Sequence, residues 1–461
     1  MNVDFSKLDR AFNPRSIVVV GDKDELRWLR CQGEFKGNLY SVQVNPETIK
    51  RIEALGVKNY TSLLDVPDPI DLVIVAVSRA LASRILDDCI RKKVAAVHFF
   101  TSGFSETATA EGIKEEKALA EKAKQAGMHL IGPNCVGIFN PGAGIKQGLD
   151  QYVGTGGAVG FISQSGDIAQ VFSIKAHLEG VDIAKSVSFG NGIVLESTDF
   201  LEYFADDPSI KVIGMYLEGI KDGKRFLRVL KEVTRKKPVV IWKGGRTEEG
   251  NRAVASHTGS LALSKNIWDA AVKQCGAINA ATEDELIDTL KAVIFLPPVR
   301  GNRVGIVGGS GGQSVVIADI FAEAGLKVPI LTDETYEQFA SFFKLVGASY
   351  RNPIDQGGTN RAEITRIIDI LERDANVDNV VFLFSTRHFD AKQTDDIIES
   401  LVNLKARTAK PLMTIIEAYF SPQWVEQVGA IIQKLQSAGI PVYLNYRRGA
   451  RALHNVWSLS R

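Results

Sequence analysis

The chain has 461 residues, of which 45% are hydrophobic and 24% are charged, and its formal net charge is +1. A chain of this length is too long for one typical hydrophobic core, so we expect two to four domains of an ordinary soluble globular protein. The nearly balanced charge excludes a general electrostatic attraction to nucleic acid or to an anionic membrane. The sequence has no apolar run that approaches the ~18 residues needed to cross a bilayer.

The N-terminus and the cysteines predict the compartment. The opening stretch "MNVDFSKLDRAFNPRS" includes acids and lacks an apolar core, which is unlike a signal peptide. The four cysteines are scattered without CxxC spacing, so they predict neither a disulfide framework nor a zinc site. We therefore expect a cytoplasmic protein with no metal site.

Three segments repeat one pattern, in which an apolar strand leads through glycine into a helix. They are "SIVVVGDKDELRWL" (16–29), "AVGFISQSGDIAQVFSIKAHLEG" (158–180) and "NRVGIVGGSGGQSVVIADIFAEAGL" (302–326). Apolar residues follow each turn at helical spacing, and further apolar strands alternate with helical stretches between the three. This alternation is typical of parallel α/β sheets.

Two stretches rich in turn-forming residues predict the domain boundaries. They are "GAGIKQGLDQYVGTG" (142–156) and "LPPVRGN" (296–302). We therefore predict three α/β domains, over residues 1–145, 150–295 and 300–461.

The three glycine turns predict anion binding. A helix N-terminus presents free N–H groups and partial positive charge, and glycine lets a phosphate approach the backbone closely. A packing role would explain any single turn equally well. None is a Walker A loop, because no lysine follows the glycines, and "GFISQSG" has Phe161 where a nucleophile elbow needs glycine.

The stretch "ASHTGSLALS" (255–264) places His257 among glycine and small hydroxyl residues. Such neighbours predict a mobile or tightly turned loop, and loops on an α/β scaffold often carry function. A neutral imidazole is nucleophilic, so a histidine in a phosphate-binding protein can accept a phosphoryl group and pass it on. It would need a carboxylate to orient its other ring nitrogen and dipoles to hold the phosphate.

With these motifs the chain resembles the α subunit of the nucleoside-diphosphate-forming acyl-CoA synthetases, the superfamily of succinyl-CoA synthetase and ADP-forming acetyl-CoA synthetase. The resemblance covers almost the whole chain, and "SHTGSLA" and "GPNCVG" are its specific signals. It also includes, in the family's order, "NPRSIVVVG", "TSGFSE", "SQSGDIA", "MYLEGIKDGKRF", "GGSGG" and "NPIDQGG".

The resemblance implies a fold and a site. The fold would be an N-terminal Rossmann-like CoA-binding domain followed by two flavodoxin-like, succinyl-CoA synthetase-like domains with parallel sheets. His257 would be the phosphorylated histidine, and Glu218, in "MYLEG", would hold its imidazole. Phosphate would be bound by two turns, made of Ser163, Gln164, Ser165 and Gly166 and of Gly309, Ser310, Gly311 and Gly312. CoA and the acyl group would contact Gly21, Lys23, Val77, Ser78, Ser102, Gly103, Asn134 and Cys135.

The resemblance also implies a reaction and a partner. The family interconverts acyl-CoA, ADP and phosphate with a carboxylic acid, CoA and ATP, through an acyl phosphate and a phosphohistidine. The sequence contains no ATP-grasp region, so Mg-ADP or Mg-ATP would bind on a separate ATP-grasp β subunit, in an assembly that we expect to be α2β2. The chain would be the catalytic α subunit of an acid–CoA ligase.

Two positions depart from the family pattern. The first glycine loop is shortened to "GDKDELRWL", which places Asp22 and Asp24 near the expected CoA phosphates and predicts weakened or shifted CoA binding. Asp167 follows "SQSG", where it suits the helix dipole but would repel a bound phosphate. These departures favour the alternative, a non-catalytic or regulatory CoA-binding homologue that keeps the fold. A dinucleotide-dependent oxidoreductase ranks below both, because no GxGxxG follows the first strand.

Overall fold

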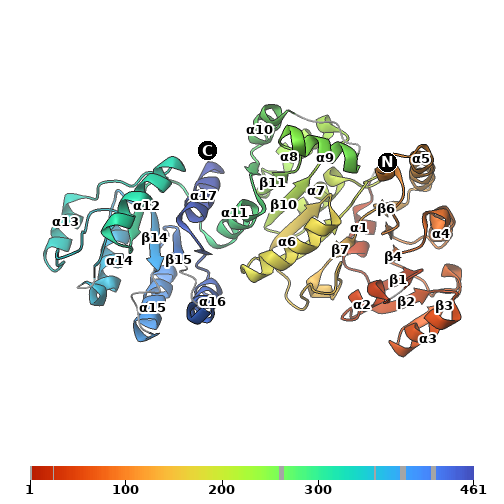
Figure 1. Ribbon diagram of the computed structural model, residues 1–461, viewed down its shortest axis with the longest axis horizontal. Coiled ribbons are helices and arrows are strands. Elements are labelled where there is room, and N and C mark those ends of the chain that lie inside the picture. Colours follow the sequence, from red (N-terminus) through yellow and green to blue (C-terminus); the bar gives the residue numbers. More distant parts are fainter. Residues whose placement is uncertain are drawn as a thin grey trace. The chain divides into compact units, whose positions relative to one another are not determined.

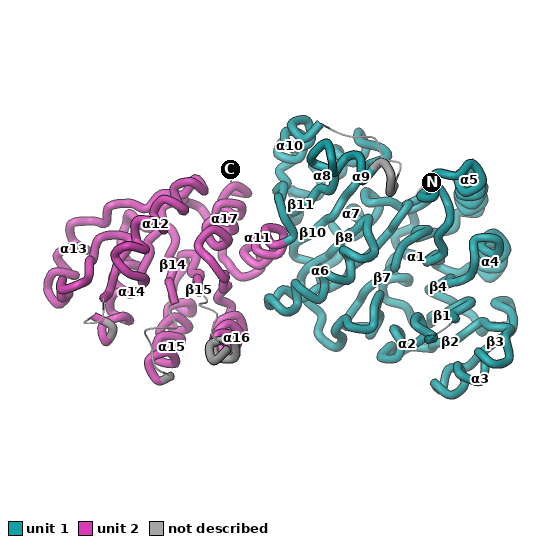
Figure 2. The backbone as a smooth tube through the Cα atoms, viewed as in Figure 1, with its two compact units in different colours: residues 1–283 teal, residues 284–461 magenta. Residues whose placement is uncertain are grey.

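The computed structural model describes residues 3–23, 25–258, 264–357, 360–384, 391–416 and 422–460, and of residues 255–258, 361, 391 and 422–427 it describes the backbone alone. The described chain divides into two compact units, residues 1–283 and 284–461 (Figure 2). Each unit is built from parallel strands and helices (Figure 1).

The first sheet of the first unit is six-stranded and parallel, in the order β3-β2-β1-β4-β5-β6. This is the Rossmann order 3-2-1-4-5-6. Strands β1, β4 and β5 are fully buried, since helices cover both faces of the sheet. The strands are β1 (Ser16–Val20), β2 (Asn38–Val42), β3 (Lys58–Tyr60), β4 (Leu72–Val75), β5 (Ala96–Phe99) and β6 (His129–Ile131). The helices are α1 (Phe5–Phe12), α2 (Arg27–Cys31), α3 (Pro46–Ala54), η1 (Leu63–Asp65), α4 (Arg79–Arg91), η2 (Ser105–Thr107) and α5 (Ala110–Gln125).

The second sheet has the order β12-β11-β10-β8-β9-β7, and all of its pairs are parallel except β7 with β9. Without the edge strand β7, the order is 2-1-3-4-5 in chain sequence, which is the flavodoxin-like topology. The strands are β7 (Gly137–Phe139), β8 (Val159–Ser163), β9 (Ile183–Ser188), β10 (Val212–Leu217), β11 (Val239–Lys243) and β12 (Ile278–Ala280). The helices are η3 (Pro141–Ala143), α6 (Gly166–Leu178), α7 (Ser197–Asp206), α8 (Gly223–Val233), α9 (Glu248–Thr258) and α10 (Lys265–Gln274).

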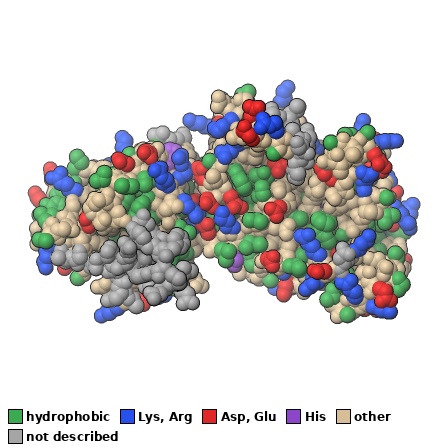
Figure 3. Space-filling view, viewed as in Figure 1, with side chains coloured by type: hydrophobic (Ala, Val, Ile, Leu, Met, Phe, Trp, Pro, Cys, Tyr) green, Lys and Arg blue, Asp and Glu red, His purple; other side chains and the backbone are tan. Residues whose placement is uncertain are grey.

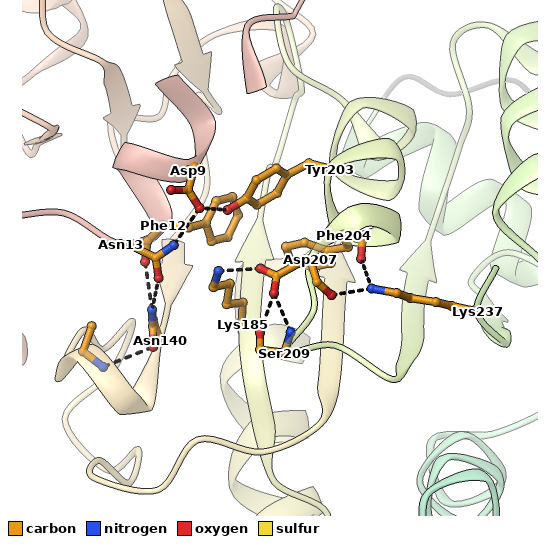
Figure 4. Close-up of polar contacts among 11 residues, drawn as sticks. Asp9, Phe12, Asn13, Asn140, Lys185, Tyr203, Phe204, Asp207, Ser209 and Lys237 are labelled. Atoms are coloured by element: carbon orange, nitrogen blue, oxygen red, sulfur yellow. Dashed lines mark hydrogen bonds and ion pairs between the residues drawn. The ribbon is translucent and has the colours of Figure 1, made fainter. Parts of the chain in front are cut away.

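Helix α1 ties the two sheets of the first unit together (Figure 4). The Phe12 ring stacks on Tyr203 of α7 at 5.1 Å, and the Tyr203 hydroxyl donates to Asp9 at 3.0 Å. Asn140, beyond β7, donates to the Phe12 carbonyl at 2.8 Å. The layers built on the first and second sheets therefore share one core, which includes Phe12, Ile131, Ile162 and Phe204.

A groove of about 610 Å³ beside this seam lies at the amino-terminal edge of the second sheet. Its charged side chains have partners: Lys185 pairs with Asp207, Asp207 also accepts from Ser209, and Asp9 accepts from Tyr203 (Figure 4). Ligands of open α/β sheets bind at the opposite, carboxyl edge. We therefore assign this groove a structural role.

The second unit holds a four-stranded parallel sheet in the order β13-β14-β15-β16. A parallel bridge from Val307 to Ile354 adds a neighbour on the free side of β13, which gives the flavodoxin-like order 2-1-3-4-5 again. The strands are β13 (Val304–Val307), β14 (Asn379–Phe384), β15 (Leu412–Ile416) and β16 (Val442–Tyr443). The helices are α11 (Glu283–Phe295), α12 (Gly311–Glu323), α13 (Asp333–Ala340), η4 (Arg361–Glu363), α14 (Ile364–Arg373), α15 (Ala391–Arg407), α16 (Pro422–Ser437) and α17 (Tyr446–Ser458).

Two helical layers cover this third sheet. Phe382 faces the core made with α13, α14, α15 and α16, and the neighbouring Leu383 faces the core made with α11, α12 and α17. Almost all of α11 belongs to the second unit, which begins at residue 284, ahead of the boundary predicted near residue 295. The α/β class, the Rossmann-like domain and the flavodoxin-like sheets are confirmed, and the three domain boundaries stay a prediction.

The surface charges and the helix lengths concern two kinds of partner discussed above, nucleic acid and a membrane. Lys, Arg, Asp and Glu side chains are interspersed over the face shown in Figure 3, in keeping with the net charge of +1. Among the residues that the structure describes, no helix is both long and apolar enough to cross a membrane.

Candidate active site

Several of the predicted site residues follow the strands at which the order of a sheet reverses. Gly21 follows β1 and Val77 follows β4, the two strands at the reversal in the first sheet. In the second sheet, the turn 163–166 follows β8 and Glu218 follows β10. The carboxyl ends of strands at such a switch point form a crevice, which is where open α/β sheets bind ligands.

Gln164 and Glu218 are joined across the switch point of the second sheet. The side-chain oxygen of Gln164 accepts from the N–H of Glu218 at 2.8 Å and from the N–H of Gly219 at 2.9 Å. The Gln164 N–H in turn donates to the Tyr216 carbonyl at 3.0 Å. Gln164, predicted to bind phosphate, thus fixes the backbone that carries the predicted orienting acid.

Two further side chains hold Glu218, and the sequence reasoning missed both. The Tyr216 hydroxyl donates to the Glu218 carboxylate at 3.3 Å, and the Lys243 ammonium donates to the Glu218 carbonyl at 2.7 Å. Burial lowers the pKa of Lys243, although the charge of Glu218 acts against this shift. Burial and the Glu218 charge raise the pKa of Tyr216. The signal for Lys243 was a lysine at the end of the apolar strand "VVIWKGG".

His257 lies in the last turn of α9, so the predicted loop is wrong for the backbone of residues 255–258. Two acids in its first turn favour this helix. The His257 side chain and residues 259–263 lie outside the described part of the chain. Two glycines after β11 lie close to α9 and to Glu218: a methyl group at Gly245 would lie 3.0 Å from Val254 of α9, and one at Gly244 would lie 3.4 Å from Glu218.

The start of α6 lies beside the predicted acyl-binding loop. Ser165 caps α6 by accepting from the Ile168 N–H, and the buried Ser163 hydroxyl donates to the Ser165 carbonyl at 2.6 Å. A methyl group at Gly166 would lie 3.1 Å from the Val136 side chain, next to Asn134 and Cys135. The exposed Asp167 stands in the first turn of α6. The first unit therefore brings the turn 163–166, Glu218 and the loop 134–135 together.

The thiol of Cys135 is buried. It donates to the Phe99 carbonyl at 3.7 Å, and burial raises its pKa. The Cys135 carbonyl contacts the Nε2 atom of His98 at 3.0 Å, and burial lowers the pKa of His98 to about 4. His98 is therefore neutral and donates to that carbonyl. Asn134, in the left-handed region at φ 58°, is the partly exposed member of the pair.

The predicted CoA segments meet at the carboxyl edge of the first sheet. Gly21 allows the chain to pass Val77, because a methyl group there would lie 2.4 Å from the Val77 side chain. Ser78 precedes α4 without capping it, so its exposed hydroxyl is free of that role. Lys23 and Ser102 are also exposed, and Gly103 adopts a φ of 102°.

The expectation that Asp22 confronts a CoA phosphate is wrong. Asp22 is 2% exposed, and its carboxylate accepts from the N–H groups of Leu29 at 2.9 Å and Lys23 at 3.1 Å. Burial raises its pKa, while these backbone hydrogen bonds act in the opposite direction. The shortened loop thus uses Asp22 as an internal cap for the short helix α2. Asp24 lies outside the described residues.

The second glycine turn belongs to the other unit. Gly309 has a φ of 87°, and Ser310 precedes α12, where its N–H and hydroxyl both donate to the Gln313 side chain at 3.1 Å. Gly311 and Gly312 form the exposed first turn of α12. The turn 309–312 lies entirely in the second unit. In the described ranges no group of three or more His, Cys, Asp or Glu side chains is arranged to hold a metal ion.

Comparison with known proteins identifies relatives of both domains of the first unit and of the whole chain. Residues 15–141 match the family model of a CoA-binding domain, and residues 156–293 match that of a succinyl-CoA ligase-like flavodoxin domain. The α subunit of ADP-forming acetate–CoA ligase II from Pyrococcus furiosus is 38% identical over 95% of this chain and 94% of its own length. Acetate–CoA ligase (ADP-forming) I from Archaeoglobus fulgidus is 33% identical over 97% of this chain, which spans only 63% of that longer relative.

Among solved structures, an acetyl-coenzyme A synthetase from Candidatus Korarchaeum cryptofilum, in complex with phosphate and ADP, superposes with a TM-score of 0.85. The match covers 98% of this chain and 96% of that one, at 29% identity. Together with the two relatives above, this similarity identifies the family. The chain belongs to the α-subunit family of the ADP-forming acyl-CoA synthetases, which are acid–CoA ligases.

Proposed function

We propose that this chain is the catalytic α subunit of an ADP-forming acyl-CoA synthetase that acts through a phosphohistidine at His257. It interconverts acyl-CoA, ADP and phosphate with a carboxylic acid, CoA and ATP. The observation that carries the proposal is the fixed pair of Gln164 and Glu218 at the switch point, beside both α9 and the Asn134 loop.

The proposed reaction has three steps, in which Asn134, His257 and Glu218 have separate roles. Phosphate attacks the thioester carbonyl beside Asn134, the carbon–sulfur bond breaks, and CoA leaves with a proton on sulfur. A neutral His257 nitrogen then attacks phosphorus, the bond to the acyl oxygen breaks, and the carboxylate leaves. Finally an oxygen of ADP attacks phosphorus, and His257 is restored as ATP forms. Glu218 holds the imidazole by accepting from its other nitrogen, as a carboxylate does for histidines in other nucleophilic sites.

The site stabilises the phosphoryl group with dipoles. The N-terminus of α6 points its free N–H groups and partial positive charge toward the turn 163–166. The turn 309–312 opens α12 of the second unit with a helix end of the same kind. Preorganised donors of this kind stabilise developing charge without reorganising during the reaction.

The nucleotide half lies on a partner. The relative from Pyrococcus furiosus, which matches this chain over nearly its full length, is named as an α subunit, and the longer relative from Archaeoglobus fulgidus continues beyond the matched region. We therefore place Mg-ADP or Mg-ATP on a separate ATP-grasp β subunit and propose an α2β2 assembly.

The test is to co-express the chain with its ATP-grasp partner and measure CoA-dependent release of phosphate from ATP with a panel of carboxylic acids. The pair should turn over at least one acid, and each chain alone should be inactive. A pair that binds CoA but turns over no acid would favour the non-catalytic CoA-binding homologue. Turnover by this chain alone would contradict the partner assignment.

A further inference from the structure

Glu106 and Glu116, which belong to the first sheet's layer, both accept hydrogen bonds from the side-chain amide of Asn191, which follows β9 of the second sheet. The Asn191 side-chain nitrogen donates to Glu116 at 2.7 Å and to Glu106 at 2.8 Å, with the Ser105 hydroxyl at 3.4 Å. An amide nitrogen carries two hydrogens, so these two carboxylates use its full donor capacity. Asn191 lies in the turn "GNG" after β9 and was not among the residues predicted from the sequence.

The two glutamates in turn hold the loop predicted to contact CoA. Glu106 accepts from the N–H groups of Gly103 at 2.5 Å and Phe104 at 3.1 Å. Glu116 accepts from the Ser105 hydroxyl at 2.7 Å and from its N–H at 3.3 Å. The conformation of the loop 102–105 therefore depends on carboxylates that Asn191 keeps in place.

Asn191 also fixes the second predicted acyl-binding loop. Its N–H donates to the Pro133 carbonyl at 3.0 Å, and its side-chain oxygen accepts from Asn134 at 3.4 Å. The preceding Gly190 makes this approach possible, because a methyl group there would lie 2.3 Å from the Asn134 carbonyl. One side chain thus links the loops 102–105 and 133–135.

The charges around Asn191 make its amide hard to replace. Burial raises the pKa of Glu106, but the hydrogen bonds from Asn191 and from the loop backbone outweigh burial and leave that pKa below its ordinary value. Glu106 is therefore a carboxylate at neutral pH. Lys221 donates to the Asn191 carbonyl at 2.8 Å and to the Gly192 carbonyl at 2.9 Å, and its charge lies near Glu116.

We propose that Asn191 is the positioning residue for the CoA thioester: its amide holds the loops 102–105 and 133–135 in register, so that the reacting carbonyl meets the phosphate turn. This role rests on the proposed function, and Asn191 acts through those loops without touching the substrate.

The experiment exchanges donor and acceptor within the network, in the complex with the ATP-grasp partner. Asn191→Asp places three carboxylates together, whereas Asn191→Asp combined with Glu106→Gln returns an amide to the pair. The glutamine that the second change introduces can still accept from the Gly103 N–H through its side-chain oxygen. Asn45→Asp is the matched control, since Asn45 is an exposed helix cap in the same unit at which aspartate serves equally well.

Asn191→Asp should lower kcat/KM for CoA by about tenfold to a hundredfold, the range for a lost hydrogen bond to a charged group. Labelling of His257 from Mg-ATP, which needs no CoA, should stay within about threefold of the unchanged protein, because the loop 102–105 takes no part in it. The double variant should recover at least about fivefold over Asn191→Asp, and Asn45→Asp should match the unchanged protein.

Lowering the pH gives a second readout. In Asn191→Asp, the neighbouring like charges raise the pKa of the introduced carboxyl group, and once protonated it can donate to Glu106 as the amide does. The CoA defect of Asn191→Asp should therefore shrink between pH 8 and pH 6, which a purely structural defect would not do.

Three results would overturn the positioning role: an unchanged kcat/KM in Asn191→Asp, a double variant no better than that single variant, or equal losses of CoA use and His257 labelling. Failure of the proposed function looks different, because the unchanged complex would then show no turnover. In that case calorimetric CoA binding should still fall in Asn191→Asp and recover in the double variant, and constant CoA affinity across the series would refute the role.

Discussion

The side-chain oxygen of Gln164 accepts hydrogen bonds from the backbone of Glu218 at 2.8 Å and of the next residue, Gly219, at 2.9 Å. The turn after β8 is thereby fastened to the end of β10, and the main chain of Glu218, the predicted orienting acid, is held in place by Gln164.

Replacing Gln164 with alanine should therefore slow phosphorylation of His257 more than it harms the fold. Losing the acceptor for both N–H groups should cost about tenfold in the rate of labelling from Mg-ATP, because Glu218 loses the hydrogen bond that fixes its backbone to the turn after β8. Gln125→Ala, on an exposed helix end of the same unit, is the control. Equal labelling rates in the two variants would refute this role for Gln164.

Lys243 should matter for stability as well as for rate. Its ammonium donates to the carbonyls of Glu218 at 2.7 Å and Gly244 at 2.5 Å, and Lys243→Met removes both of these hydrogen bonds. Because a charged donor to two carbonyls is lost, we expect urea unfolding to show a loss of about 1–3 kcal/mol. Lys236→Met removes only an exposed ion pair with Asp206 and should cost at most about 1 kcal/mol. A Lys243→Met protein as stable as Lys236→Met would show that the hydrogen bonds of Lys243 to these carbonyls do not stabilise the fold.

Asp22→Ala separates the capping role of this carboxylate from repulsion of CoA. Because the carboxylate accepts from Leu29 and Lys23, its removal should lower the free energy of unfolding by about 1 kcal/mol. Calorimetric affinities for CoA and for dephospho-CoA should change by less than about threefold, because the charge faces inward. Markedly tighter CoA binding by Asp22→Ala would support the expectation from the sequence that Asp22 repels the CoA phosphates.

His98 predicts a loss of stability in mild acid. The folded protein keeps it neutral, with a pKa of about 4, while the unfolded chain binds a proton below the ordinary value of 6.5. This contribution to stability is complete above pH 6.5 and falls as the pH drops toward 4. Between pH 7 and pH 5 it should amount to about 2 kcal/mol. Buried His129, whose pKa is also lowered by burial, adds in the same direction.

Urea unfolding of His98→Gln at both pH values isolates this contribution. Glutamine keeps a donor for the Cys135 carbonyl but does not titrate. The difference in unfolding free energy between pH 7 and pH 5 should shrink in this variant, and the same difference as in the unchanged protein would show that His98 is not its source.

The sequence predicted the fold well, because apolar strands and glycine turns in alternation leave few topologies besides parallel α/β sheets. It also predicted the segments that meet at the switch point, since "SQSG" and "MYLEG" end neighbouring strands. It could not predict which side chain of a turn faces a ligand. Gln164 and Asp22 satisfy backbone donors, and Cys135 is buried, because local hydrogen bonding decides those orientations.

The sequence motifs do not identify residues that link the first sheet to the second. Asn191 contacts Glu106 and Glu116 across more than seventy positions of the chain, so no local spacing links them. Lys243 ends a strand that reads as purely structural, and its partner is a main-chain carbonyl. The helical backbone of His257 was missed because small polar neighbours favour loops, although two acids at the start of α9 favour the helix.

Phosphorylation of His257 is tested most directly by incubating the complex with its ATP-grasp partner, magnesium and γ-labelled ATP, and mapping the label by mass spectrometry. We expect an acid-labile, base-stable phosphoryl group on His257 that is discharged by ADP, and by a carboxylic acid together with CoA. Glu218→Gln should slow its formation without unfolding the protein. A His257→Asn complex that still carries this label, or an unchanged complex that never acquires it, would contradict the assignment.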